Sequence, residues 1–242
     1  MHCRQILALA GAALALAACQ PSGGDDPAFG RRVRAYLLSH PEILQEMSER
    51  LETKQAEADE AGRRRAEALI PKLRDRIERD PADYVANPGG RITVTEFYDY
   101  RCPHCANAAP KVLDLIRRRP DVRVVFKESP IFGAVSEHAA RAALAVRQAG
   151  GDSLGLYQTF MTTHGLDDAA IDRIALQKGA RPADLAAGGT AAQNAHLQRN
   201  AALFSELDLQ GTPAFIVGDR IILGEDMGAV EAAVSGSASK GS

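Results

Sequence analysis

The stretch from Phe97 to Cys105 constrains the fold of this chain more than any other part of the sequence. The run that leads into this stretch, Ile92 to Phe97, alternates polar and apolar side chains, which predicts a β-strand. The residues after it, Ala106 to Arg117, place apolar side chains at helical spacing, which predicts an α-helix. A Cys-Pro-His-Cys sequence at 102–105 therefore lies where a strand gives way to a helix.

This position favours a reactive thiol at Cys102. The first N–H groups of a helix have no helical partner, and with the helix dipole they stabilise an anion such as a thiolate. Pro103 suits the first helical position because its missing N–H would have had no partner there. His104 adds hydrogen-bond donors, and a positive charge when protonated. Cys105 lies one turn further on, where it can attack a mixed disulfide formed on Cys102, so we predict a redox dithiol.

Other interpretations of the cysteine pair remain open. They are a buried structural pair, half of a zinc site, and a copper site made by Cys102, Cys105 and a nearby histidine. Structural zinc takes four protein ligands, and the sequence contains no second Cys-x-x-Cys and no closely spaced histidine pair. No third copper ligand is evident either. We therefore predict no metal and no cofactor beyond the dithiol itself.

Three motifs occur in order along the chain: EFYDYRCPHC from Glu96 to Cys105, FKESP from Phe126 to Pro130, and GTPAF from Gly211 to Phe215. Together they resemble the DsbA-like family of thioredoxin-fold thiol–disulfide oxidoreductases, and within it the ScsC-like, suppressor-of-copper-sensitivity branch. The resemblance covers about residues 91–235. It implies an α/β, thioredoxin-like fold with a helical subdomain inserted at about residues 134–207.

The resemblance also implies a proton relay beneath the dithiol. Glu96 lies on an inward-facing strand position and matches an acid that handles protons for the second cysteine. Burial raises the pKa of a carboxyl group, which suits that role; an exposed charge at the strand end is the alternative. Lys127, at the end of the predicted strand Val122 to Phe126, matches the basic partner of that acid.

The third motif leads into a predicted hairpin, with strands Ala214 to Val217 and Arg220 to Ile222 joined by a Gly-led turn. A proline is tolerated at the first residue of a strand. The resemblance implies that Pro213 is cis and lies against the dithiol. The backbone of Thr212 would then pair with an extended substrate. A closing helix is predicted from Gly224 to Val234, followed by a flexible tail at residues 236–242.

The N-terminus has the pattern of an export signal over residues 1–18. Arg4 precedes the apolar run Ile6 to Ala18, which is too short to span a bilayer as mature structure. The sequence Leu16 to Cys19 resembles a bacterial lipoprotein box, in which Cys19 carries the lipid; an ordinary secretory signal cleaved nearby is the alternative. We therefore expect a lipid-anchored protein on the periplasmic side of a bacterial cell envelope.

Export leaves the domain with a single pair of thiols. The sequence contains four cysteines, of which Cys3 is removed with the signal and Cys19 is blocked by the lipid. No structural disulfide can then form, which fits a catalyst of disulfide exchange better than a disulfide-stapled secreted module. The net charge of −2, with no basic patch among aromatic residues, argues against a nucleic-acid partner.

The region between the signal and the predicted domain is divided into a tether at residues 19–28 and a helical extension at residues 29–90. A helix from Glu42 to Glu67 would be about 39 Å long and has too few apolar side chains to bury. We predict that residues 29–51 form a homo-oligomerising arm, followed by a solvated stalk. A helix packed on its own domain, or a partly disordered spacer, is the alternative.

These inferences predict thiol–disulfide exchange on exported, cysteine-containing proteins, together with a membrane redox partner. The direction of exchange depends on reduction potential and on that partner. By resemblance to the ScsC-like branch, the arm and the threonine before Pro213 favour a disulfide isomerase or reductase. A dithiol oxidase of the DsbA type is the alternative.

Overall fold

The structure is a computed structural model that describes residues 26–186 and 188–238. The predicted signal at residues 1–18, Cys19 and most of the tether lie outside the described residues. The chain divides into two compact units between Glu57 and Ala58, and each is described by itself. Among the described residues, no helix has both the length and the apolar character needed to cross a membrane.

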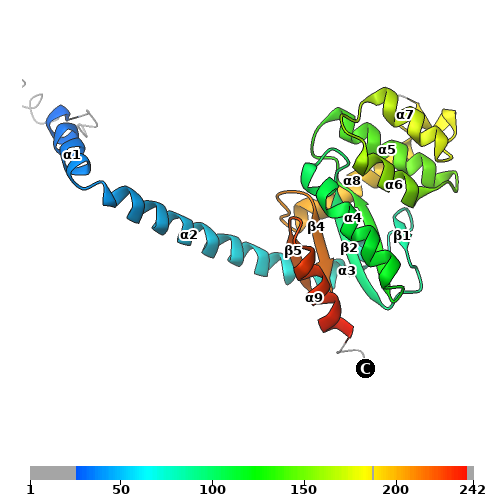
Figure 1. Cartoon of the computed structure of the whole chain (residues 1–242), viewed down its shortest axis with the longest axis horizontal. Helices are drawn as coiled ribbons and strands as arrows, with labels where there is room; N and C mark the ends of the chain where they lie inside the picture. The colour runs from blue at the N-terminus through cyan, green and yellow to red at the C-terminus, as the bar shows by residue number, and fades with distance from the viewer. Residues whose placement is uncertain (1–25, 187, 239–242) are drawn as a thin grey trace, which may run out of the picture. The chain divides into compact units, whose positions relative to one another are not determined.

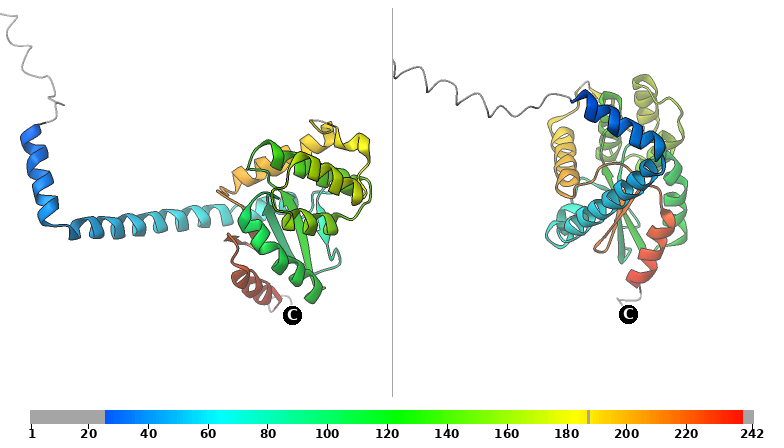
Figure 2. Two further views of the ribbon diagram at one scale, coloured as in Figure 1. Left: turned by 45° about the horizontal axis from the view of Figure 1, so that its top comes forward. Right: turned by 90° about the vertical axis from the view of Figure 1, so that its left-hand side faces the viewer.

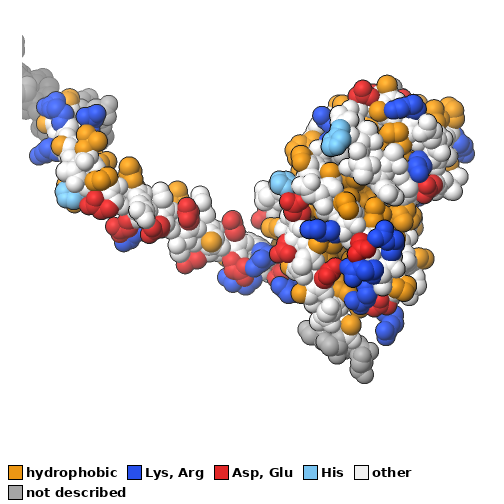
Figure 3. All heavy atoms as spheres, in the orientation of Figure 1, with side chains coloured by type: hydrophobic (Ala, Val, Ile, Leu, Met, Phe, Trp, Pro, Cys, Tyr) orange, Lys and Arg blue, Asp and Glu red, His pale blue; other side chains and the backbone are white. Residues whose placement is uncertain are grey.

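The first unit consists of α1 (Pro27–Ser39) and the larger part of α2 (Glu42–Glu67). The Asp26 side chain accepts the Ala28 N–H at 2.9 Å and caps α1, so the helix begins two residues before the predicted start of the helical extension at residue 29. No residue of α1 is buried. Hydrophobic side chains lie among charged ones on both helices (Figure 3). Leu37 and Ile43 are partly buried, whereas seven large ones are 39–67% exposed: Phe29, Val33, Tyr36, Leu38, Leu44, Met47 and Leu51.

The second unit is built on a five-stranded sheet of order β1-β3-β2-β4-β5. Its strands are β1 (Tyr84–Ala86), β2 (Ile92–Tyr98), β3 (Val122–Glu128), β4 (Ala214–Val217) and β5 (Arg220–Leu223). β2 and β3 are parallel and the other neighbouring pairs are antiparallel. A parallel pair needs a crossover, which α4 (Pro103–Arg118) supplies. The predicted strands and hairpin are confirmed.

Helices cover both faces of this sheet (Figure 1). On one face, α4 and α9 (Met227–Ala238) pack over side chains such as Val94 and Phe126. On the other face, α3 (Ile70–Glu78) and the end of α8 (Ala191–Glu206) pack over Phe97 and Ile216. Because both faces are buried, the central strands β2 and β3 consist mostly of buried residues.

A helical subdomain is inserted between β3 and β4, which confirms the prediction for residues 134–207. It consists of α5 (Ala134–Gln148), α6 (Ser153–Thr162), α7 (Asp168–Gln177), a short 3₁₀ helix (Pro182–Leu185) and α8. Helices α5, α6 and α7 pack on one another and gather at one end of the sheet (Figures 1 and 2). Helix α6 also packs against α4, so the insertion reaches the helix that follows the dithiol.

Two predicted boundaries are wrong. Helix α3 and strand β1 fall within the helical extension predicted at residues 29–90, but in the structure they belong to the second unit. Ile70 and Ile77 of α3 are buried in its core, and β1 pairs with β3. A strand of three residues is too short for alternation to reveal it. At the other end, α9 continues to Ala238, so the first residues of the predicted tail are helical.

A buried ion pair joins the segment before β1 to the sheet. Lys127 Nζ lies 2.6 Å from Asp83 Oδ2, and both side chains are buried. The register of β2 and β3 pairs Glu96 with Phe126, so Lys127, one residue on, points to the opposite face from Glu96. The predicted pairing of Lys127 with Glu96 is therefore wrong, because the lysine charge is neutralised by Asp83 on the other side of the sheet.

Replacing this lysine should destabilise the fold. Lys127→Met leaves the Asp83 carboxylate buried without its cation, and we expect the free energy of unfolding to fall by about 3–5 kcal/mol. Denaturation with urea measures the change. Arg118→Met is the matched control, because it removes only partly exposed pairs with Asp114 and Glu231, and it should lower the free energy of unfolding far less. An unchanged midpoint for Lys127→Met would contradict the assignment.

Candidate active site

The dithiol lies at the beginning of α4, as the sequence predicts. Cys102 is the N-cap residue with an extended backbone, and Pro103 is the first helical residue. The backbone N–H groups of His104 and Cys105 act on the Cys102 sulfur and help to lower its pKa. The first turn of the helix thus supplies donors to an anion on this sulfur.

The two sulfurs have different environments, although both are free thiols. Cys102 is 2% exposed and Cys105 is 0% exposed. A hydrogen bond from the Cys105 thiol, a contact with the Thr212 side chain and the two backbone N–H groups together lower the pKa of Cys102 to about 5, although burial raises it. Burial, and the hydrogen bond to Cys102, raise the pKa of Cys105 far above its ordinary value. At neutral pH Cys102 is therefore a thiolate and Cys105 a thiol.

His104 contributes to this site through its backbone. Its N–H helps to lower the pKa of Cys102. Its imidazole is 67% exposed, and Nδ1 lies 3.5 Å from Glu225 Oε1. The prediction that the His104 side chain stabilises the thiolate is therefore replaced by a backbone contribution, because the ring is directed to a surface carboxylate.

The loop before β4 covers the dithiol. The Thr212–Pro213 peptide bond is cis, as the resemblance implies. The Cys102 sulfur lies 3.1 Å from the Thr212 carbonyl oxygen, to which it donates a hydrogen bond when protonated. The Gly224 N–H donates to the Pro213 carbonyl at 2.8 Å, which ties this loop to the end of β5. Backbone atoms of residues 212–213 thus lie next to the nucleophilic sulfur.

Glu96 lies in the core beside Cys105. It is 0% exposed, so the alternative of an exposed charge is wrong. The Tyr157 hydroxyl donates to both of its carboxylate oxygens, at 3.1 and 3.2 Å. Burial raises the pKa of Glu96 to about 8, although this hydrogen bond lowers it. The Glu96 charge in turn raises the pKa of Cys105, so the two groups are close enough to interact. Such a carboxyl can give up or accept a proton near neutral pH.

Sequence reasoning missed two residues that shape the site. Asp99 accepts the Arg101 N–H at 2.8 Å and the N–H groups of Ile131 and Phe132 at 2.7 and 3.1 Å, so it ties the dithiol loop to the loop after β3. An aspartate that follows a strand is a turn signal that could have revealed it. Tyr157 lies 61 residues from Glu96, and no local pattern connects them.

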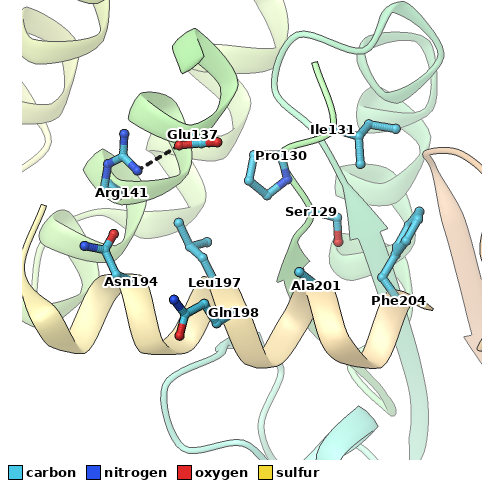
Figure 4. A pocket seen from close by; sticks show the side chains of 10 residues that line it. All are labelled: Ser129, Pro130, Ile131, Glu137, Arg141, Asn194, Leu197, Gln198, Ala201 and Phe204. Carbon is cyan, nitrogen blue, oxygen red and sulfur yellow. Dashed lines mark hydrogen bonds and ion pairs between the residues drawn. The ribbon is translucent and has the colours of Figure 1, made fainter. Parts of the chain in front are cut away.

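A surface pocket of about 440 Å³ lies beside the loop after β3. In Figure 4 Pro130 projects over Leu197 of α8, with the Glu137–Arg141 ion pair at one end and Phe204 at the other. The neighbouring side chains of Ile131 and Phe132 are about half exposed. Because Asp99 holds this loop against the dithiol loop, apolar surface lies near the nucleophile.

Two of the three histidines of the insertion, His138 and His196, lie in ion-pair contacts with carboxylates. His138 lies 2.8 Å from both Asp168 and Asp172, and the buried His196 lies 3.4 Å from Glu128. Within residues 26–186 and 188–238, no group of three His, Cys, Asp or Glu side chains is arranged to hold a metal ion.

Comparison with known proteins agrees with this geometry. Residues 93–233 match the model of the DSBA-like thioredoxin domain, and residues 27–58 match that of the Copper resistance protein ScsC N-terminal domain. The first match covers more than half of the chain, so the protein belongs to the DsbA-like family of thioredoxin-fold proteins and is a thiol–disulfide oxidoreductase. The two domains together assign it to the ScsC-like branch of that family.

Solved structures support the same assignment. A thioredoxin-like oxidoreductase from Silicibacter pomeroyi DSS-3 shares 35% identity over 69% of this chain and 98% of its own, with a TM-score of 0.63. Proteus mirabilis ScsC in a transitional conformation shares 31% identity over 89% and 99%, with a TM-score of 0.64. A periplasmic thioredoxin-like protein from Salmonella enterica serovar Typhimurium shares 29% over 67% and 94%, with a TM-score of 0.61. No match was found among curated proteins.

The ionisation of Cys102 is directly measurable. In the reduced protein, the rate of alkylation by iodoacetamide should rise with pH with a midpoint near pH 5, because only the thiolate reacts. Cys105→Ala should move the midpoint upward, since it removes the largest stabilising hydrogen bond. His104→Ser, which keeps the backbone N–H, should move it less. A midpoint near the free-cysteine value in the unaltered protein would refute the assignment.

Proposed function

We propose that the protein is a disulfide isomerase or reductase of exported, cysteine-containing proteins. The observation that carries this proposal is the combination of a thiolate-stabilising dithiol in the second unit with exposed apolar helices in the first. The dithiol supplies the exchange chemistry, and the apolar helices, in the segment that matches the ScsC N-terminal domain, offer surface for self-association.

The proposed reaction begins with attack of the Cys102 thiolate on a substrate disulfide. The substrate S–S bond breaks, one substrate sulfur leaves as a thiolate, and a mixed disulfide forms on Cys102. A second substrate thiol can then displace Cys102, which completes isomerisation. Alternatively, the Cys105 thiol gives its proton to Glu96 and its sulfur displaces the substrate from Cys102. The substrate is then reduced, and the protein holds the Cys102–Cys105 disulfide. No cofactor is needed, because the dithiol carries both electrons.

The substrate is proposed to lie along the loop before β4. The Thr212 carbonyl is already within hydrogen-bond distance of Cys102, so a strand that pairs with this backbone would present its sulfur to the nucleophile. The half-exposed Ile131 and Phe132 offer apolar contacts to an unfolded chain. Backbone pairing and apolar contact are tolerant of sequence, as a catalyst of many substrates requires.

The first unit is proposed to make a homo-oligomer through residues 29–51. Most of its large apolar side chains are exposed, and a group of exposed apolar side chains on one segment supports an interaction site there. Several active sites on one oligomer would raise the effective concentration of the next attack on a bound, misfolded substrate. Repeated attack on one substrate is what distinguishes isomerisation from a single exchange.

The protein is proposed to act at the periplasmic side of the cell envelope, anchored by a lipid on Cys19. The export pattern of residues 1–18 supports this location, and a similar Salmonella protein is described as periplasmic. An isomerase must be returned to the dithiol state after each oxidation of its cysteines. A membrane redox partner that supplies electrons is therefore part of the proposal.

One observation favours the alternative of a dithiol oxidase. A low Cys102 pKa stabilises the reduced protein, which makes its disulfide more oxidising. Refolding of a scrambled substrate separates the two functions, because an oxidase alone does not rearrange disulfides that are already formed. Copper stoichiometry on the purified protein tests the remaining alternative, a copper-binding role for the dithiol.

The roles of the two cysteines predict different trapping behaviour. Cys105→Ala should accumulate mixed disulfides with exported proteins, because attack by Cys102 proceeds but resolution does not. Cys102→Ala should accumulate none, since the remaining thiol is buried and protonated. Non-reducing electrophoresis of periplasmic extracts measures both. Adducts on Cys102→Ala alone would reverse the two roles.

The role of the first unit predicts the effect of its removal. Deleting residues 20–57 should give a monomer that still reduces simple disulfides but refolds a scrambled substrate about tenfold more slowly or worse. The deletion stops before Ala58 because Ala66 is buried in the core of the second unit. Light scattering gives the oligomeric state.

Substitution at an exposed charge of α2, Glu49→Gln, is the matched control and should change neither property. A monomeric full-length protein would defeat the idea. So would a truncated monomer that isomerises at the full-length rate.

A further inference from the structure

The buried Glu96 carboxylate has one hydrogen-bond partner among the described residues, the hydroxyl of Tyr157. This hydroxyl contacts both carboxylate oxygens, at 3.1 and 3.2 Å. Tyr157 belongs to α6 of the helical insertion, and α6 packs against α4, the helix that begins at the dithiol. A residue of the insertion thus reaches the acid proposed to serve Cys105.

The position that could have held a cation beside Glu96 is apolar. The strand register places Phe126 opposite Glu96, and Lys127 is paired with Asp83 on the other face. The Glu96 carboxylate is therefore hydrogen-bonded by a neutral hydroxyl, where the family resemblance implies a lysine.

The other titratable groups around this site have partners of their own. Tyr98 and Tyr100 are linked to each other by a hydrogen bond between their hydroxyl groups at 3.0 Å. Beyond them, Arg147 lies 3.4 Å from Glu128. Cys105 and the Cys102 thiolate complete the set on the α4 side. Within the described residues none of these groups donates a hydrogen bond to Glu96, and Tyr157 is the donor that does.

The Tyr157 ring is held firmly. It packs edge-to-face against Phe126, Tyr98 and Tyr100, with centroid distances of 4.9, 5.3 and 6.3 Å. Burial, and then the charge of Glu96, raise the pKa of Tyr157 well above its ordinary value, so its hydroxyl remains a donor throughout the physiological range. A fixed, permanent donor suits a positioning role.

We propose that Tyr157 is a positioning residue for the second half of the exchange reaction, and that its hydroxyl favours the ionised form of Glu96 and orients the carboxylate to take the proton of Cys105. This rests on the proposed role of Glu96. In the mixed disulfide, the Cys105 S–H gives its proton to the Glu96 carboxylate, and the Cys105 sulfur attacks the Cys102 sulfur. The bond between Cys102 and the substrate breaks, the Cys102–Cys105 bond forms, and the substrate leaves as a thiolate.

The hydroxyl matters because burial works against the reactive form of the acid. Even with the Tyr157 hydrogen bond in place, burial raises the pKa of Glu96 to about 8, so only a minority of the carboxyl groups are ionised at neutral pH and able to accept a proton. A hydrogen bond to both oxygens favours the ionised form. Removing the hydroxyl should raise the pKa of Glu96 further and move resolution to higher pH.

The test follows the two steps of exchange separately in the full mature chain. Reduced protein is mixed with a fluorescent peptide disulfide, quenched at intervals, and analysed for mixed disulfide and for oxidised protein across a range of pH. For Tyr157→Phe, we expect the midpoint of the resolution step to rise by about one to two pH units. Attack by Cys102 should keep its rate, and it serves as the internal control.

The matched control is Tyr100→Phe, which removes a buried hydroxyl from the same aromatic cluster but no hydrogen bond to Glu96. In Tyr100→Phe, the pH midpoint of the resolution step and the pKa of the Glu96 carboxyl should both stay at the values of the unaltered protein. A ¹³C NMR titration of the Glu96 carboxyl should show a raised pKa in Tyr157→Phe alone. An equal shift in both variants would indicate a general packing effect and overturn the proposal.

Glu96→Gln separates this inference from the proposed role of the acid. If Glu96→Gln resolves the mixed disulfide at the unaltered rate, the role of Glu96 fails. If Glu96→Gln is slow but Tyr157→Phe keeps the normal midpoint, only the role of Tyr157 fails. In the Glu96→Gln background, Tyr157→Phe should cause no further loss, and a second, additive loss would overturn a role exerted through Glu96.

Discussion

The chemistry of this protein depends on the difference between two sulfur atoms one helical turn apart. Cys102 caps α4, where backbone N–H groups and the Cys105 thiol stabilise its negative charge. Cys105 faces the core, where burial keeps its proton in place. One helix terminus set at the boundary of a hydrophobic core therefore gives the two thiols different pKa values, which supports the proposed roles of Cys102 as the nucleophile and Cys105 as the resolving thiol.

The register of the central strands determines which charges reach that site. Glu96 faces α4 and the insertion, whereas Lys127 faces α3 and is neutralised by Asp83. A shift of one residue in a strand exchanges its two faces, so a motif that places an acid and a lysine near each other in sequence does not by itself pair them. The insertion completes the site instead, through the hydroxyl of Tyr157.

The two units differ in how they use their apolar residues. The second unit buries them in clusters on both faces of its sheet. In the first unit, the apolar side chains of α1 and the early turns of α2 stay exposed among charged residues (Figure 3). An amphipathic helix that buries little apolar surface gains little stability by itself, which supports the proposed self-association of the first unit.

The sequence alone determined the strand–dithiol–helix unit, the hairpin after Pro213 and the bounds of α2, because each follows from local periodicity or turn chemistry, whereas the helical insertion came from the family resemblance. The family resemblance added the burial of Glu96 and the cis bond at Pro213. Tertiary structure alone decided that β1 joins the sheet, that Lys127 pairs with Asp83, and that Tyr157 holds Glu96. These contacts join residues far apart in the chain, and they depend on which face of a strand or helix meets which neighbour, a choice that local patterns do not encode.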